Sequence, residues 1–224
     1  MKSILLGLCL ISLSFSSKAQ DSESTKPYGG ENAKVVIQTD MGEIIVQLYN
    51  ETPLHKENFL KLVEKGFYDS LLFHRIIPEF MIQGGDPLSK NAAKGSALGM
   101  GGGDMARIPA EFNELLIHKR GALAAARDNN PEKASSACQF YLVQGKQVTD
   151  EELDQLELQQ GRKYTEEQRK IYKEIGGTPF LDMNYTVFGE VEKGLDVIDK
   201  ILEAKRDNNN RPLQDIRMKI SVFK

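Results

Sequence analysis

Residues 73–86 have the sequence Phe-His-Arg-Ile-Ile-Pro-Glu-Phe-Met-Ile-Gln-Gly-Gly-Asp. Apolar runs on either side of Pro78 predict two short strands, over 71–77 and 80–83, joined by a turn. Arg75 stands in the first strand among apolar neighbours, and a cation is costly to bury without a partner. The spacing alone leaves two interpretations open: a structural ion pair or edge-strand charge, or a functional group.

Short strands are predicted on both sides of this stretch, from short apolar or alternating runs bounded by turn residues. They cover, in chain order, residues 35–37, 44–48, 71–77, 80–83, 121–126, 137–143, 185–191 and 216–222. One helix is predicted to be capped by Thr52-Pro53 and to end near Gly66, and a second to cover 195–202. About eight strands and two helices predict a mainly β fold, a closed eight-stranded antiparallel β-barrel capped by two helices.

Residues from about 148 to 177 have a different character, charged and helical. Thr149 with Glu152 and Thr165 with Gln168 have the spacing of capping boxes, which predicts two short helices inserted in a barrel loop. We weigh two interpretations of this helical insertion, a solvated decoration, which we favour, and a functional lid.

The first residues are typical of an export signal. Lys2 precedes a short apolar run, residues 4–15, and Ser17-Lys18-Ala19 offers a small-residue cleavage site. We therefore predict a signal peptide at 1–19, a flexible lead-in at 20–33 and a domain at 34–224. The protein is then exported, periplasmic or otherwise extracytoplasmic, without membrane insertion since the run is too short for a span. A lipoprotein is disfavoured, because Cys9 lies inside the run.

Composition narrows the function classes. The 224 residues carry a net charge of −3, and no basic stripe stands out, so nucleic acid is not an expected partner. Cys138, the one cysteine beyond the predicted signal, cannot form an internal disulfide and is predicted to be a buried apolar residue. The three histidines lack metal-ligand spacing, and the glycine-rich residues 99–103 lack a phosphate-loop ending and are interpreted as a surface turn. An enzyme built from this sequence is expected to need no metal or cofactor.

The stretch at 73–86 closely resembles the signature of the cyclophilin-type peptidyl-prolyl cis–trans isomerases, here of a bacterial, exported type. Three further matches follow in chain order and cover, with the first, roughly residues 34–222. They are Gly121–Ala126, the Cys138–Tyr141 run that is similar to Ser-Gln-Phe-Phe, and Phe180–Asp182 with Val187–Gly189, which are similar to Trp-Leu-Asp and Val-Phe-Gly. Four matches in the same order argue against coincidence, whereas one match alone would be weak evidence for the family.

The resemblance implies rotation about X-Pro bonds as the reaction. Resonance opposes rotation of a peptide bond by roughly 18–20 kcal/mol, and only X-Pro bonds have cis and trans forms of comparable energy. In the twisted state the prolyl nitrogen regains a lone pair. The resemblance assigns Arg75 as the donor to that nitrogen, Gln83 as the group that holds Arg75 and a substrate backbone group, and Phe80 as the third catalytic residue.

The resemblance also implies the substrate-binding residues. They are Met81, Ala126, Arg127, Gln139, Tyr141, Phe180, Leu181 and Tyr185. Side chains two apart share a face of a strand, which places Met81 with Gln83 and Gln139 with Tyr141. The apolar members are expected to clamp the proline ring, with ordinary core packing as the alternative. The expected partners are unfolded or flexible polypeptides that contain proline.

Four positions depart from the family pattern. Tyr141 replaces the usual Phe, and its hydroxyl is expected to make the proline pocket shallower or wetter. Phe180 replaces Trp, so cyclosporin binding is expected to be weak because the indole donor is missing. Tyr185 stands where some members have His. Arg127 replaces an Asn and is expected to favour acidic substrate segments.

A proline-peptide binding module or chaperone with little catalysis is the alternative function. Such a protein would keep the groove and use it, or the insertion, to hold partners. The presence of Arg75, Phe80 and Gln83 together favours the enzyme.

Overall fold

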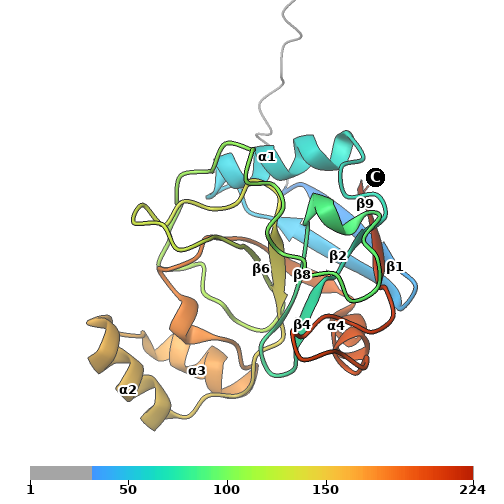
Figure 1. Ribbon diagram of the computed structural model, residues 1–224. Helices are drawn as coiled ribbons and strands as arrows, with labels where there is room; N and C mark the ends of the chain where they lie inside the picture. The colour runs from blue at the N-terminus through green and yellow to red at the C-terminus, as the bar shows by residue number, and fades with distance from the viewer. Residues whose placement is uncertain (1–31, 224) are drawn as a thin grey trace, which may run out of the picture.

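The computed structural model describes residues 32–223 (Figure 1). The predicted signal peptide at 1–19 and most of the lead-in at 20–33 lie outside the described residues. Within the described range, none of the helices combines the length and apolar character needed to cross a bilayer.

One antiparallel sheet of nine strands forms the body of the protein, in the order β3-β9-β1-β2-β8-β6-β7-β5-β4. The strands are β1 (Lys34–Thr39), β2 (Gly42–Leu48), β3 (Leu71–Leu72), β4 (Arg75–Ile77), β5 (Met81–Gly84), β6 (Ala122–Ala125), β7 (Phe140–Val143), β8 (Val187–Lys193) and β9 (Arg217–Val222). The helices are α1 (Pro53–Glu64), α2 (Asp150–Gln160), α3 (Glu166–Glu174) and α4 (Leu195–Leu202), with short 3₁₀ turns η1 (Pro87–Ser89) and η2 (Pro179–Leu181).

The two edge strands of the sheet, β3 and β4, are consecutive pieces of one segment. Only Phe73 and His74 separate them, and the curled sheet closes through this segment. The Phe73 amide donates to the Ile216 carbonyl and the His74 amide to the Gln83 carbonyl, each at 3.0 Å. The predicted mainly β barrel is therefore confirmed, with nine strands instead of eight because the predicted strand at 71–77 divides into two.

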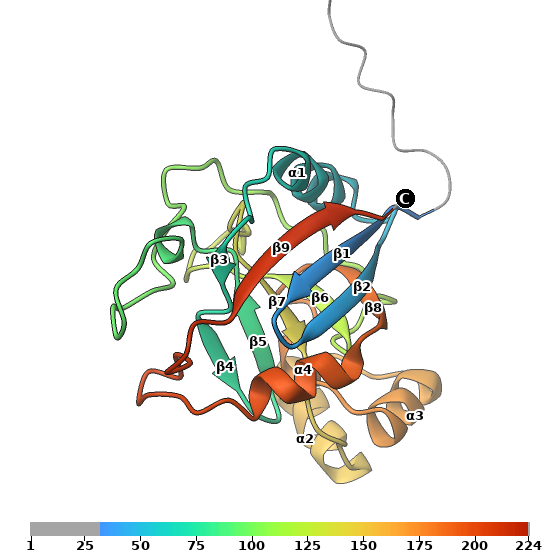
Figure 2. The ribbon, with the colours of Figure 1, turned by 90° about the vertical axis from the view of Figure 1, so that its right-hand side faces the viewer.

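The interior follows from the alternation of side chains along the strands. In β1, β2 and β9 buried residues alternate with more exposed ones, and the buried residues meet in one core. Apolar stripes of α1 and α4 enter the same core, through Phe59, Leu60 and Val63 from α1 and Ile198 and Ile201 from α4. Figure 2 shows the two helices at opposite ends of the curled sheet.

The start of α1 differs from the expectation that Thr52 caps it. The Thr52 side chain makes no capping hydrogen bond. The carboxylate of Glu111, from a distant loop, instead accepts from the amides of Leu54 and His55, at 3.0 Å each. An acidic group at this position satisfies free amides and complements the positive end of the helix dipole.

The helical insertion contains α2 and α3, and each has the capping box expected from the sequence. The two helices lie together on one side of the barrel (Figure 1). Their apolar side chains form a separate cluster of Val148, Leu153, Tyr164 and Tyr172 with Ile117 of the barrel. The insertion is therefore packed against the body of the protein, which the interpretation as a solvated decoration did not anticipate.

The two ends of the insertion meet at the barrel. Gly177 forms isolated bridges with both Lys119 and Lys146. Its backbone is so close to its neighbours that a β-carbon at this position would lie 2.2 Å from the His118 carbonyl oxygen. Only glycine fits there, which fixes where the inserted segment returns to the barrel.

Candidate active site

Four strands bring their side chains into one row across the sheet. Arg75 of β4 is the register partner of Gln83 on β5, Gln83 is that of Tyr141 on β7, and Tyr141 is that of Ala124 on β6. The row follows from antiparallel pairing alone, because residues directly opposite share a face of the sheet. Residues far apart in the sequence thereby gather at one site.

A cleft of about 130 Å³ opens beside this row. It is lined by Arg75, Phe80, Met81, Gln83, Ala126, Arg127, Tyr141, Leu181 and Tyr185. All nine belong to the site residues expected from the sequence. Of the other two, Gln139 lines an adjoining hollow of about 380 Å³ together with Gln83, Ala126 and Arg127. Phe180 is 47% exposed and packs on the rim against Phe80, with ring centroids 5.7 Å apart.

Arg75 reaches the mouth of this cleft, half-buried. Its Nη1 donates to Oε1 of Gln83 at 3.3 Å, and its guanidinium carbon lies 5.9 Å from the Phe80 ring centroid. Burial lowers the pKa of Arg75, and the nearby Tyr185 opposes this shift. Within residues 32–223 no carboxylate forms an ion pair with Arg75. The guanidinium keeps its charge, and that charge is not neutralised by a neighbour.

A chain of amide groups holds Gln83 beneath Arg75. Gln83 Nε2 donates to Oε1 of Gln139 at 3.1 Å, and Gln139 Nε2 donates to the carbonyls of Gly99 and Gly101 at 2.9 and 3.0 Å. Every acceptor in this chain is neutral. Gln83 is thus fixed with its carbonyl oxygen toward Arg75, which orients the guanidinium without neutralising it.

The glycine-rich loop at 99–103 belongs to this support, which the interpretation as a surface turn missed. The buried Asp86, the last residue of the signature stretch, accepts a hydrogen bond from the Gly99 amide. A β-carbon on Gly101 would lie 2.0 Å from Asp86 Oδ1, so the close approach requires glycine. Its glycine content was the only sequence signal, and glycine alone does not distinguish an anchored loop from a free one.

The apolar wall of the cleft is continuous. Met81 and Tyr141 are buried, and Phe80, Leu181 and Tyr185 pack against the same cluster. The Tyr141 hydroxyl lies 3.0 Å from Nε2 of the buried His118. Because a buried partner satisfies this hydroxyl, it does not wet the cleft as expected from the sequence, and the Tyr141 ring serves as apolar wall.

The opposite rim carries a second cation. The Arg127 guanidinium lies over the Tyr185 ring, 4.6 Å from its centroid, and donates to the carbonyls of Asn184 and Asp128. Carbonyl acceptors leave its charge unneutralised, as at Arg75. The backbone of Ala126 is already engaged, because its amide donates to the Gln139 carbonyl and its carbonyl accepts from the Ser136 amide. Only the second lone pair of that carbonyl is left for a substrate, which limits the backbone contact that Ala126 can make.

The other reactive side chains are structural. Cys138 is buried, and burial raises the pKa of its thiol, so the thiolate is disfavoured. Burial likewise lowers the pKa of His74 to about 4 and keeps its ring neutral. In the part of the chain that the structure describes, no three His, Cys, Asp or Glu side chains are grouped to hold a metal ion.

Comparison with known proteins identifies the class. The model of the family described as cyclophilin type peptidyl-prolyl cis-trans isomerase/CLD matches residues 34–222, so the chain belongs to this family. The protein is an enzyme of the peptidyl-prolyl cis-trans isomerase class.

Two relatives and one solved structure are similar to this chain. A protein of Staphylococcus saprophyticus that carries the name of a peptidyl-prolyl cis-trans isomerase is 34% identical over 190 residues, which are 84% of this chain and 89% of the relative. One from Staphylococcus aureus with the same name is 35% identical over 186 residues, 82% of this chain and 87% of the relative. A crystal structure of a Cryptosporidium parvum cyclophilin type isomerase shares the fold, with a TM-score of 0.63 at 22% identity over 86% of this chain and 98% of that one.

Proposed function

We propose that the cleft catalyses rotation about X-Pro bonds in flexible segments of exported polypeptides and thereby assists their folding. One observation carries the proposal: a guanidinium whose charge no carboxylate neutralises lies at the mouth of an apolar cleft of about 130 Å³. A second crystal structure of the Cryptosporidium parvum enzyme, in the presence of the dipeptide Ala-Pro, shares the fold at a TM-score of 0.61 and 23% identity, covering 85% of this chain and 99% of that one.

The chemistry requires no covalent intermediate. The apolar wall of Phe80, Met81, Tyr141 and Leu181 holds the proline ring, and the carbonyl on the other side of the bond rotates. As the bond twists, resonance is lost and the prolyl nitrogen becomes a hydrogen-bond acceptor. Arg75 donates to this nitrogen only in the twisted state, so it stabilises the transition state more than the substrate.

A protease-coupled assay with a proline tetrapeptide tests the assignment. Arg75→Ala is expected to lower kcat/KM by about 10²–10³-fold, the range for removal of one preorganised donor. Arg75→Lys keeps the charge without the planar fork and is expected to restore only part of the rate. Arg206→Ala, which removes an exposed arginine outside the cleft, is the control and should match the unaltered protein.

The same variant separates the two functions considered for the sequence. An isomerase loses catalysis in Arg75→Ala and with it the acceleration of proline-limited refolding, a step that takes tens of seconds or more without a catalyst. A binding module or chaperone would hold unfolded chains equally well in both forms. Equal rates for Arg75→Ala and the unaltered protein would refute the role of Arg75.

Export is proposed from residues 1–19. The support is the charge order, the short apolar run and the small-residue cleavage site. Expression of the full chain, followed by fractionation and N-terminal sequencing, is expected to give an extracytoplasmic chain that begins near Gln20. A chain started at residue 20 should stay in the cytoplasm. An uncut full chain found in the cytoplasm would contradict this proposal.

A further inference from the structure

The helical insertion reaches a buried carboxylate beside a residue of the cleft wall. Asp182 is 2% exposed and directly follows Leu181 of the apolar wall. Tyr172, at the end of α3, donates its hydroxyl to Asp182 Oδ2 at 2.7 Å. Arg162, between the two inserted helices, places Nη1 3.1 Å from the same oxygen. A buried carboxylate is stable only with such partners, and the insertion supplies both partners of this oxygen.

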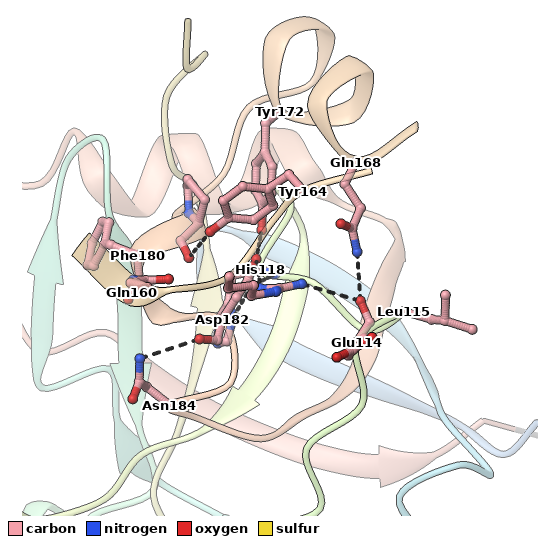
Figure 3. A network of polar contacts seen from close by, with 12 residues as sticks. Glu114, Leu115, His118, Gln160, Tyr164, Gln168, Tyr172, Phe180, Asp182 and Asn184 are labelled. Carbon is pink, nitrogen blue, oxygen red and sulfur yellow. Dashed lines mark hydrogen bonds and ion pairs between the residues drawn. The ribbon is translucent and has the colours of Figure 1, made fainter. Parts of the chain in front are cut away.

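The other carboxylate oxygen holds His118. Asp182 Oδ1 accepts from the backbone amide of His118 and from its ring Nδ1, both at 2.8 Å (Figure 3). A carboxylate can only accept, so Nδ1 carries a hydrogen. The Tyr141 hydroxyl is hydrogen-bonded to the other ring nitrogen, Nε2, at 3.0 Å.

This series of hydrogen bonds reaches the cleft through Tyr141. Its ring lies nearly parallel to that of His118, with centroids 6.1 Å apart, and meets the Tyr185 ring edge-on at 6.0 Å. Tyr141 lines the cleft and is the register partner of Gln83. The hydrogen bond to His118 fixes how far the ring projects into the space that the proline ring would fill.

We propose that the helical insertion is a positioning element of the cleft, with Tyr172 as its positioning residue. Tyr172 and Arg162 hold Asp182, Asp182 fixes the tautomer and orientation of His118, and His118 holds the Tyr141 ring in place. The inference rests on the proposed function, since it concerns how the same cleft is shaped. It assigns the insertion a role that needs neither movement nor contact with substrate.

The experiment is a double-mutant cycle on peptide isomerisation by the whole protein. Tyr172→Phe removes only the hydroxyl that holds Asp182, and it is expected to lower kcat/KM by about three- to tenfold, the scale of one buried hydrogen bond. Tyr141→Phe keeps the ring and removes the hydroxyl that ties it to His118. If Tyr172 acts through Tyr141, then adding Tyr172→Phe to Tyr141→Phe lowers kcat/KM no further.

A second measurement follows the series of hydrogen bonds that leads from Tyr172 to Tyr141. The ring ¹⁵N shifts of His118 report which nitrogen carries the hydrogen, and they are expected to change in Tyr172→Phe. The control is Tyr68→Phe, a tyrosine 1% exposed in the barrel core whose hydroxyl has no partner in the described residues. It should leave both kcat/KM and the His118 shifts unchanged. If Tyr172→Phe does not fold, Arg162→Gln, which removes the other partner of Oδ2, takes its place in the cycle.

Two results would overturn the proposal. One is an equal loss of kcat/KM from Tyr172→Phe in both backgrounds, which indicates a general structural effect. The other is an unchanged rate with unchanged His118 shifts. Failure of the proposed function is a separate outcome, because the unaltered protein would then show no isomerisation and Arg75→Ala would change nothing.

Discussion

Gln83 lies directly opposite Arg75 in an antiparallel pair and accepts a hydrogen bond from Nη1 of Arg75 at 3.3 Å. The partner is an amide and not a carboxylate. A neutral acceptor orients the guanidinium and leaves its charge available, whereas a carboxylate at the same place would neutralise it. The choice of residue at position 83 therefore decides whether Arg75 can act on a third group.

This relationship gives a direct prediction for Gln83→Glu. The side chain keeps its shape, gains a charge and loses the Nε2 donor to Gln139. Its carboxylate should bind Arg75 in a charge-assisted hydrogen bond, which contributes about 1.5–3 kcal/mol. We expect kcat/KM for a proline tetrapeptide to fall by about ten- to hundredfold, with the fold retained by circular dichroism. Gln159→Glu, on the exposed face of α2, adds the same charge elsewhere and should leave the rate unchanged. An unaltered rate in Gln83→Glu would show that the neutral partner is unimportant.

Phe180 governs the prediction for cyclosporin. The ring is on the rim of the cleft, 47% exposed, so the larger indole of Trp can be accommodated there. Since Phe has no donor, Phe180→Trp is expected to raise affinity for cyclosporin about tenfold, the equivalent of one hydrogen bond. Titration calorimetry measures it. Phe223→Trp, at an equally exposed site near the C-terminus, is the control. Tight binding by the unaltered protein would contradict the expectation.

Two buried tyrosines predict opposite effects on stability. Tyr68 buries a hydroxyl without a partner within residues 32–223, whereas the Tyr172 hydroxyl donates to Asp182. Tyr68→Phe should leave the free energy of unfolding unchanged or raise it by up to about 1 kcal/mol, and Tyr172→Phe should lower it by about 1–3 kcal/mol. Urea denaturation gives both values. Equal losses in the two variants would disprove the distinction.

His74 makes stability depend on pH. Burial lowers its pKa from 6.5 to about 4; Asp86 opposes this shift, and Arg75 and Arg211 reinforce it. As pH falls below 6.5 the unfolded chain binds a proton that the folded protein refuses, so the stability present above pH 6.5 is lost between about pH 6.5 and 4. The slope is up to about 1.4 kcal/mol per pH unit.

His74→Phe isolates this effect. Phenylalanine keeps an aromatic ring at this position but has no group that titrates, so the unfolding free energy of the variant should fall less steeply over that pH range. Other groups, His55 among them, contribute to both proteins and cancel in the difference. Parallel pH profiles for the variant and the unaltered protein would show that His74 does not contribute.

Sequence patterns within a few residues predicted much of the fold and part of the cleft. Alternation along 216–222, the capping boxes at Thr149 and Thr165, and the turn at Pro78 depend on neighbours within a few residues, and each corresponds to an element of the structure. Nine of the eleven site residues that the family resemblance implied line one cleft. Strand parity and antiparallel pairing account for Arg75, Met81, Gln83 and Tyr141. The other five lie outside the strands, and only the resemblance indicated them. Their roles stay predictions until variants are measured.

The features that were missed connect residues far apart in the chain. Glu111 caps α1 from 56 residues away, and His118 meets Tyr141 across 23. Gln139 reaches the Gly99 carbonyl across 40 residues. The spacing of residues in the sequence does not indicate such pairings, since each partner is an ordinary polar residue in its own segment. Only packing of the whole barrel brings these groups together.

The place of β9 in the sheet has a consequence for how the protein is made. This strand lies between β3 and β1, so β3 has no sheet partner, and β1 has only β2, until residues 217–222 have left the ribosome. The sheet cannot be completed before β9 has been made, and pairings between segments far apart in the chain form slowly. If residues 1–19 direct secretion as predicted, this delay keeps the nascent polypeptide unfolded, as passage through a translocation channel requires.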